Sequence, residues 1–140
     1  MQSVSVVQKL SKGDEVLVYN EHGNLRDSSS ELFTQFIGIL LEDPDIIFHA
    51  RNERNIRAHT VITYSDVDIN RGNGMTRSTG TFTAPASGTY YFQFQGVNSL
   101  FGSNKYAGFY IEYGGRFKAA SYINKVRLFT CANLHTGRSK

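Results

Sequence analysis

The sequence predicts an all-β fold, a jelly-roll sandwich of two antiparallel sheets, from three observations. Between residues 90 and 94, aromatic side chains alternate with Tyr91 and Gln93, the period of a strand with one buried face. The chain is 13% aromatic and holds 13 glycines against 2 prolines, which suits short strands and tight turns. Strand-like segments recur roughly every 8–12 residues, as in sandwiches and jelly rolls.

The length and composition indicate one domain. A chain of 140 residues can bury roughly two thirds of its unfolded surface without disulfides or metal. Its net charge of +3 is only mildly basic, so we expect no nucleic-acid partner. It contains no run of about 18 apolar residues, so we expect no membrane span, and its N-terminus has no signal-peptide pattern. Cys131 is the only cysteine, which excludes an intrachain disulfide.

The first strands are predicted at residues 3–10 and 15–19, with a turn at Gly13 between them. Residues 20–30 include asparagine, glycine, aspartate and three consecutive serines. We therefore expect an exposed, mobile loop in this stretch.

Residues 31–41 carry conflicting signals. A capping-box pattern before them and an apolar spacing near 3.6 residues favour a helix. Against this, Gly38 lies in the middle and the residues around it are apolar on both sides, as in a strand covered on two faces. We predict a strand over residues 32–41, with Ile37 and Ile39 on the face opposite the core.

The later strands are predicted from β-branched and aromatic runs bounded by turn residues. Asp43-Pro44-Asp45 should form a turn, because proline breaks strand pairing. The Gly114-Gly115 pair suits a two-residue turn. The expected strands are residues 46–50, 60–64, 106–113 and 116–123, with two more inside 80–94. The expected loops are residues 51–59, 66–79 and 97–104, and the end of the tail, 135–140, should be frayed.

Four aromatic residues should share one buried face. Pro85 and Gly88 suit the turn inside residues 80–94. The strand after this turn places alternate aromatic residues on one side, and the strand before it adds another. The four are Phe82, Tyr90, Phe92 and Phe94.

Several motifs spread along the chain form a specific combination. It includes Phe48-x-Ala50 and Gly88-x-Tyr90-x-Phe92. The residues that carry the combination are Gly13, Asp14, Val16, Phe36, Gly38, Leu40, Leu41, Phe48, Asn70, Gly80, Phe82, Pro85, Gly88, Tyr90 and Phe92. Together they resemble the globular-head domain of the complement C1q family, a jelly roll related to tumour necrosis factor. One departure from the resembled family is Met75, which stands where that family usually has an aromatic residue.

The motifs occur in an unusual order. In the resembled family, the motifs found here in residues 1–42 end the domain, and those found in residues 43–140 begin it. One explanation is a circular permutation, with the family's ends joined near Asp43-Pro44-Asp45. The other is a piece of a tandem array, with the end of one domain and the start of the next. Because both pieces are needed for a full set of strands, we expect residues 1–140 to close as one domain within a chain rather than by exchange between chains.

A search for catalytic and metal-binding patterns is largely negative. The four histidines have no His-x-His or His-x-Asp partner of the kind that holds iron in jelly-roll oxygenases. Asp66 and Asp68 alone fall short of the roughly 6–8 oxygens that calcium takes. We therefore expect no catalysis, no metal and no cofactor.

Three arginines form the most suggestive polar group. Arg51, Arg54 and Arg57 occur within seven residues, and guanidinium groups bind sulfate, phosphate and carboxylate. These arginines are therefore candidates for binding an anionic ligand. The alternative is a solvated loop in which they pair with Glu53 and nearby acids.

The resemblance implies a non-enzymatic, extracellular recognition module that forms a homotrimer and binds carbohydrate, protein or anionic surfaces through its loops. The trimer also follows from Ile37 and Ile39, which need a cover because a two-sheet sandwich has only one core. In the resembled family this strand lies near the threefold axis. Two alternatives stay open: a metal-dependent jelly-roll enzyme of the cupin type, and a trimerisation unit without a ligand of its own.

Overall fold

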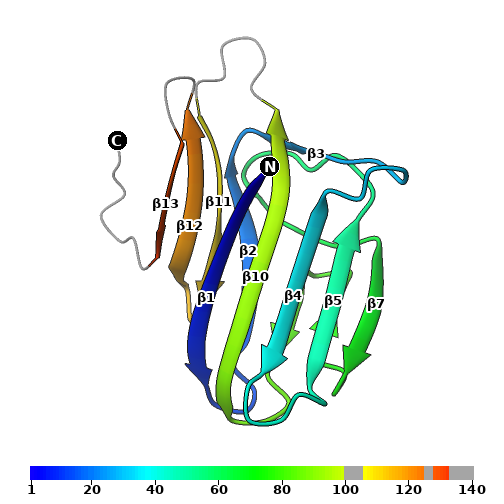
Figure 1. The fold of residues 1–140 in the computed structure, drawn as a ribbon, viewed down its shortest axis with the longest axis vertical. Helices are drawn as coiled ribbons and strands as arrows, with labels where there is room; N and C mark the ends of the chain where they lie inside the picture. The colour runs from blue at the N-terminus through cyan, green and yellow to red at the C-terminus, as the bar shows by residue number, and fades with distance from the viewer. Residues whose placement is uncertain (100–105, 125–127, 133–140) are drawn as a thin grey trace.

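A computed structural model describes residues 1–99, 106–124 and 128–132, which form a sandwich of two antiparallel sheets (Figure 1). No helix occurs among these residues, and the predicted all-β jelly-roll class is confirmed. The strands are β1 (Gln2–Leu10), β2 (Glu15–His22), β3 (Asn24–Arg26), β4 (Thr34–Leu40), β5 (Ile47–Asn52), β6 (Thr60–Val61), β7 (Asp66–Arg71), β8 (Met75–Thr76), β9 (Thr81–Thr83), β10 (Gly88–Ser99), β11 (Tyr106–Tyr113), β12 (Arg116–Asn124) and β13 (Leu128–Ala132).

The two sheets have six and seven strands. The six-stranded sheet has the order β1-β10-β4-β5-β7, and β3 also pairs with β10. The seven-stranded sheet has the order β13-β12-β11-β2-β9-β8, and β6 also pairs with β2. Strands that are distant in sequence are thus neighbours in both sheets, as expected of a jelly roll.

The first 42 residues contribute to both sheets. Strand β4 lies between β10 and β5 in the six-stranded sheet, which Figure 1 shows as the cyan strand among green ones. Strand β2 lies between β11 and β9 in the other sheet. The turn after β4 is closed by hydrogen bonds from the amides of Leu40 and Asp43 to the carbonyls of Ile46 and Leu40. The N-terminal segment therefore fills central positions instead of forming a separate unit.

The conflicting signals before β4 resolve into one turn followed by a strand. The amides of Glu31 and Leu32 donate to the carbonyl of Ser28, and the Ser28 hydroxyl donates to the Glu31 carboxylate over 3.2 Å. The chain then enters β4 at Thr34, so the capping signal builds a single turn and no helix. The predicted strand is confirmed, with its start two residues later than expected, because pairing with β10 and β5 outweighs local propensity.

Two segments expected to be loops contain strands. Residues 20–30 include β3, whose Leu25 is fully buried, and Asp27 accepts hydrogen bonds from the amides of Ser28, Phe33 and Thr34. The prediction of an exposed, mobile loop there was wrong, because pairing with β10 supplies order that the polar composition does not reveal. Residues 66–79 include the edge strand β7, in which polar residues alternate with Val67 and Ile69, and the glycines and asparagines after it give the segment its loop-like composition.

Smaller differences occur at strand ends. Strand β10 continues to Ser99, into the segment expected to be a loop, while residues 100–104 of that loop lie outside the described residues. The strand expected at residues 60–64 is limited to β6. Residues 135–140, expected to be frayed, also lie outside the described residues.

The core is an aromatic cluster between the sheets. The four aromatic residues predicted to share a buried face, Phe82, Tyr90, Phe92 and Phe94, are each at most 2% exposed, which confirms the prediction. The Phe48 and Phe82 rings stack with centroids 4.8 Å apart, so this cluster joins both sheets. The Phe94 and Phe109 rings meet edge to face at 4.7 Å.

Candidate functional site

Six apolar side chains on the outer side of the six-stranded sheet form one surface, which we call the apolar face. They are Val7, Tyr91, Ile39, Ile47, Ile37 and Ile69. The sheet register places the first four in one row across β1, β10, β4 and β5. The last two flank His49 in the next row. A regular sheet thus brings together side chains from five strands.

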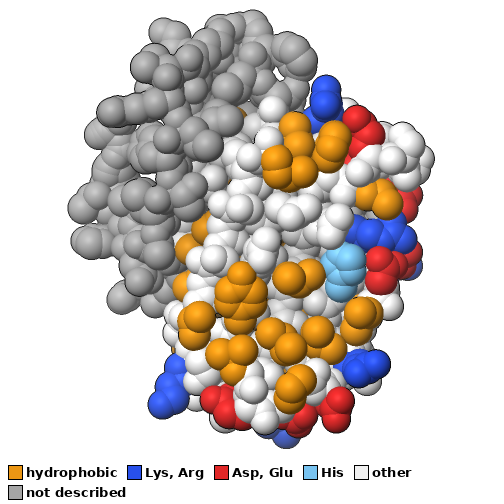
Figure 2. Space-filling model, in the orientation of Figure 1, with side chains coloured by type: hydrophobic (Ala, Val, Ile, Leu, Met, Phe, Trp, Pro, Cys, Tyr) orange, Lys and Arg blue, Asp and Glu red, His pale blue; other side chains and the backbone are white. Residues whose placement is uncertain are grey.

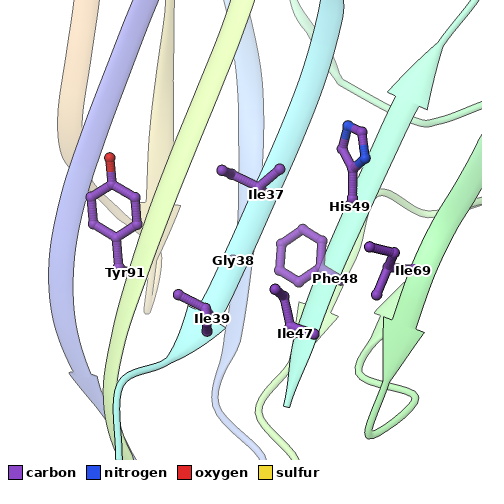
Figure 3. Close-up of a pocket in the computed structure, with 8 residues that line it drawn as sticks. All are labelled: Ile37, Gly38, Ile39, Ile47, Phe48, His49, Ile69 and Tyr91. Atoms are coloured by element: carbon purple, nitrogen blue, oxygen red, sulfur yellow. The ribbon is translucent and has the colours of Figure 1, made fainter. Parts of the chain in front are cut away.

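The apolar face is open to solvent in the single chain. Val7 is 59% exposed and Ile69 is 40% exposed. Figure 2 shows hydrophobic side chains gathered on this side of the molecule, with charged residues toward the rim. Five of the six residues line an open hollow, together with Gly38, Phe48 and His49 (Figure 3). A contiguous apolar surface of this kind marks an interaction site in a soluble protein.

Strand alternation and one glycine set the direction of the isoleucines on β4. Phe36 and Leu40 are buried, whereas Ile37 and Ile39 are half-buried on the opposite side. A Cβ at Gly38 would overlap the Phe48 ring and lie 2.8 Å from Cδ1 of Phe92. Gly38 therefore lets two core rings pack directly under β4, and the isoleucines beside it face outward, as predicted.

His49 is the polar side chain inside the hollow. Its Nε2 lies 3.0 Å from Oε1 of Gln35, and its Nδ1 lies 3.8 Å from Oδ2 of Asp68. Its side chain is 28% exposed. The ring therefore lies partly within the aliphatic surface and partly against the charged rim.

Arg51 is bound by three carboxylates. Its Nε donates to Asp68 at 2.7 Å, and its two terminal nitrogens donate to Glu53 and Asp66 at 2.9 Å each. The hydrogen bond that the guanidinium donates to Asp68, followed by the one that it donates to Glu53, raises its pKa further above the ordinary value. The same contact with Arg51 holds the pKa of the Asp68 carboxyl below its usual range. The donors of Arg51 are thus committed inside the chain.

Arg54 and Arg57 lie apart from this network. Both are exposed in the segment between β5 and β6, and no ion pair joins either of them to another described residue. Their backbone is fixed, since the Arg57 carbonyl accepts hydrogen bonds from Asn20 Nδ2 at 2.9 Å and from the Thr60 hydroxyl at 2.8 Å. The structure therefore does not gather the three arginines into one clamp, and it leaves two of them facing solvent on an anchored loop.

Within the described residues, no group of three or more His, Cys, Asp or Glu side chains is placed to hold a metal ion. Asp66 and Asp68, considered above as calcium ligands, bind Arg51 instead. In the same part of the chain, no helix of sufficient length and apolar character to cross a bilayer is found.

Sequence reasoning identified Ile37 and Ile39 and placed Tyr91 on the outward side of its strand, but it missed Val7, Ile47 and Ile69. Ile47 could have been found from the alternation of β5, which points Ile47, His49 and Arg51 to one side. Ile69 could also have been found, because Val67 and Ile69 alternate with polar residues over positions 66–70, but the glycines and asparagines that follow favoured a loop. The sequence held no signal that Val7 belongs to this face. Alternation shows which side of its own strand a residue lies on, but it does not show that β1 will pair with β10.

Comparison with known proteins gives one match. The family model described as the C1q domain matches residues 47–127, which is more than half of the chain. No curated protein and no solved structure matches the chain. The match begins at β5 and spans the core strands β9 and β10, where the Phe48, Phe82 and Phe92 rings meet. The chain therefore belongs to the C1q domain family.

Proposed function

We propose that this chain is a non-enzymatic extracellular recognition module that assembles as a homotrimer through the apolar face and binds its ligand through its loops. C1q domains are generally non-enzymatic, typically extracellular, and typically oligomerise and bind ligands. The observation that carries the proposal is the apolar face, which is exposed in the single chain and is built mainly of aliphatic side chains.

Further copies of the same chain are the most suitable cover for the apolar face. Interfaces between identical subunits are richer in apolar contacts than the remaining surface. In a closed cyclic oligomer, every copy of an apolar patch is buried against a neighbouring subunit, and none stays exposed. The charged rim, with Arg51 bound by its three carboxylates, stays outside the aliphatic rows and can remain hydrated. This division into an apolar centre and a polar rim is typical of subunit interfaces.

Replacing Ile37 with lysine should convert the trimer to a monomer. The ammonium group would lie in the middle of the apolar face, where contact with a partner subunit would remove its hydration water. This desolvation of an unpaired charge opposes association. Sedimentation at micromolar concentration is the measurement. The control is Val61→Lys, which places the same charge on β6 at an exposed position of the other sheet and should leave the trimer intact. If Ile37→Lys sediments like the wild type, the apolar face is not the interface.

The same variant tests how the chain closes. We infer that the motif order is a circular permutation and that residues 1–42 complete the sandwich of their own chain. The tight hydrogen-bonded turn between β4 and β5, and a family match that begins only at residue 47, support this. A folded Ile37→Lys monomer of 15.7 kDa is the expected result. A folded species of two chains that resists dissociation would instead indicate exchange of strands.

The ligand is proposed to be anionic and to contact Arg54 and Arg57. These guanidinium groups face solvent, whereas Arg51 is occupied. The double variant Arg54→Ala/Arg57→Ala should weaken binding of a sulfated polysaccharide by about tenfold or more, because charge-assisted hydrogen bonds are lost. Binding is measured by isothermal titration at low salt, with Arg71→Ala on the edge strand β7 as the control. Equal affinity of the double variant and the control would show that these two arginines do not contact the ligand, and a wild type that does not bind would favour a trimerisation unit without this ligand.

A further inference from the structure

We propose that self-association through the apolar face is pH-sensitive, because it covers His49 and accepts only the neutral form of its imidazole. The inference rests on the proposed trimer and concerns the regulation of the same surface. Its basis is the position of the ring and the groups around it.

His49 lies between isoleucines of the apolar face, on the side where this face meets the charged rim. The sheet register sets it between Ile37 of β4 and Ile69 of β7, and Ile47 lies on the same side of β5 (Figure 3). All three isoleucines line the same hollow as His49. A partner surface that covers these side chains therefore also covers the ring, which is 28% exposed in the single chain.

The direct contacts of the ring suit its neutral form. A neutral ring with its proton on Nε2 donates a hydrogen bond to Oε1 of Gln35 over 3.0 Å. Nδ1 lies 3.8 Å from Oδ2 of Asp68, which is too far for a hydrogen bond. That same oxygen accepts from Nε of Arg51 at 2.7 Å, so Asp68 is held toward Arg51 and not toward the ring. The second proton of an imidazolium would find no acceptor at hydrogen-bond distance among these groups.

The charged and titratable groups around the ring come from β5, β7, β10 and the segment after β5. Strand β4 contributes none, since it presents Gln35 and Ile37 to the ring. The groups are Arg51 on β5, Glu53 after it, Asp66, Asp68 and Arg71 on β7, and Tyr91 on β10. The three carboxylates share the one guanidinium of Arg51, so the rim has an excess of negative charge, but it is hydrated and charge interactions there are weak. Removing water from an imidazolium therefore costs more than these carboxylates return.

The sign of the effect follows from proton binding. If the assembly holds neutral rings, it binds fewer protons than the free subunits, so association weakens as pH falls. The charge of a histidine side chain changes within the range of about pH 5 to about pH 8, so lowering the pH in this range favours the protonated ring in the free subunit. A loss of about tenfold in the binding-competent form of each subunit raises the concentration of half-assembly of three subunits by about 30-fold.

The test is sedimentation equilibrium of the wild type and of His49→Gln at about pH 7.5 and about pH 5.5. Glutamine keeps a hydrogen-bonding group of similar reach but cannot titrate. The wild type should show the rise of about 30-fold, and the variant should change by less than about threefold. His22→Gln, at the end of β2 in the other sheet, is the matched control and should behave like the wild type. His49→Leu should show the same flat response as His49→Gln, and near-ultraviolet circular dichroism checks the fold at each pH.

Each outcome separates the two proposals. A wild-type trimer of equal or greater strength at the lower pH, or an undiminished response in His49→Gln and His49→Leu, would overturn the pH switch and leave the trimer standing. A wild-type monomer at both pH values would overturn the trimer and the switch with it.

Discussion

Replacing Phe92 with alanine should lower the free energy of unfolding by about 3–5 kcal/mol. The side chain is fully buried, and its ring lies 5.6 Å from that of Phe82 and 5.9 Å from that of Phe36, measured between centroids. Those partners belong to β9 and β4, in opposite sheets. Truncation therefore removes apolar burial and leaves a cavity at the contact between the sheets, where rigid strands cannot collapse to fill it.

Urea denaturation of the Ile37→Lys form would measure this loss, because a monomeric background keeps oligomerisation out of the free energy. Gln95→Ala, three residues along the same strand and partly exposed, is the control and should cost less than about 1 kcal/mol. A loss for Phe92→Ala as small as that of the control would mean that the aromatic cluster does not hold the sheets together.

Replacing Gly80 with alanine should cost about 3 kcal/mol or more, from two independent causes. The residue has φ of +73°, where a side chain adds strain of about 1–2 kcal/mol. Its Cβ would also overlap the carbonyl oxygen of Ile62. That backbone cannot easily move, because the Ile62 amide donates to the carbonyl of Val18 at 2.9 Å and the Ile62 side chain is fully buried.

Gly114→Ala separates the two causes. Gly114 has φ of +61°, but no atom of the described residues lies within 4 Å of the position that its Cβ would take, so only the backbone strain applies. The substitution should cost about 1–2 kcal/mol in the same urea experiment. If the two substitutions lowered the free energy of unfolding equally, the overlap with the Ile62 carbonyl would add no cost at Gly80.

The fold was largely predictable because its strongest signals are strictly local. The alternation around Phe92 and the two glycines at 114 and 115, both with positive φ, appear in the structure as expected. The edge strand β7 was missed although Val67 and Ile69 alternate with polar residues over positions 66–70, because the asparagines and glycines at 70–74 favoured a loop. The burial of Leu25 was missed for a related reason, since its bridge to Ile56 joins segments about thirty residues apart.

The candidate site was predictable only in part. The outward direction of Ile37 follows from alternation around Gly38, but the row that it joins depends on which strands become neighbours. For the arginines, the limit is that the partners of a side chain can come from a strand that is distant in the sequence. The alternative in which Arg51 pairs with Glu53 appears in the structure, but Arg51 also binds two carboxylates of β7 that are 15 and 17 residues away. Partners of this kind are set by sheet topology and cannot be read from local composition.

The central claim is that the apolar face is a subunit interface, and the mass of the unmodified protein in solution tests it most directly. Sedimentation equilibrium at about pH 7.5 should give three times the chain mass of 15.7 kDa at micromolar concentration. A soluble species of 15.7 kDa that persists as the concentration is raised would contradict the account.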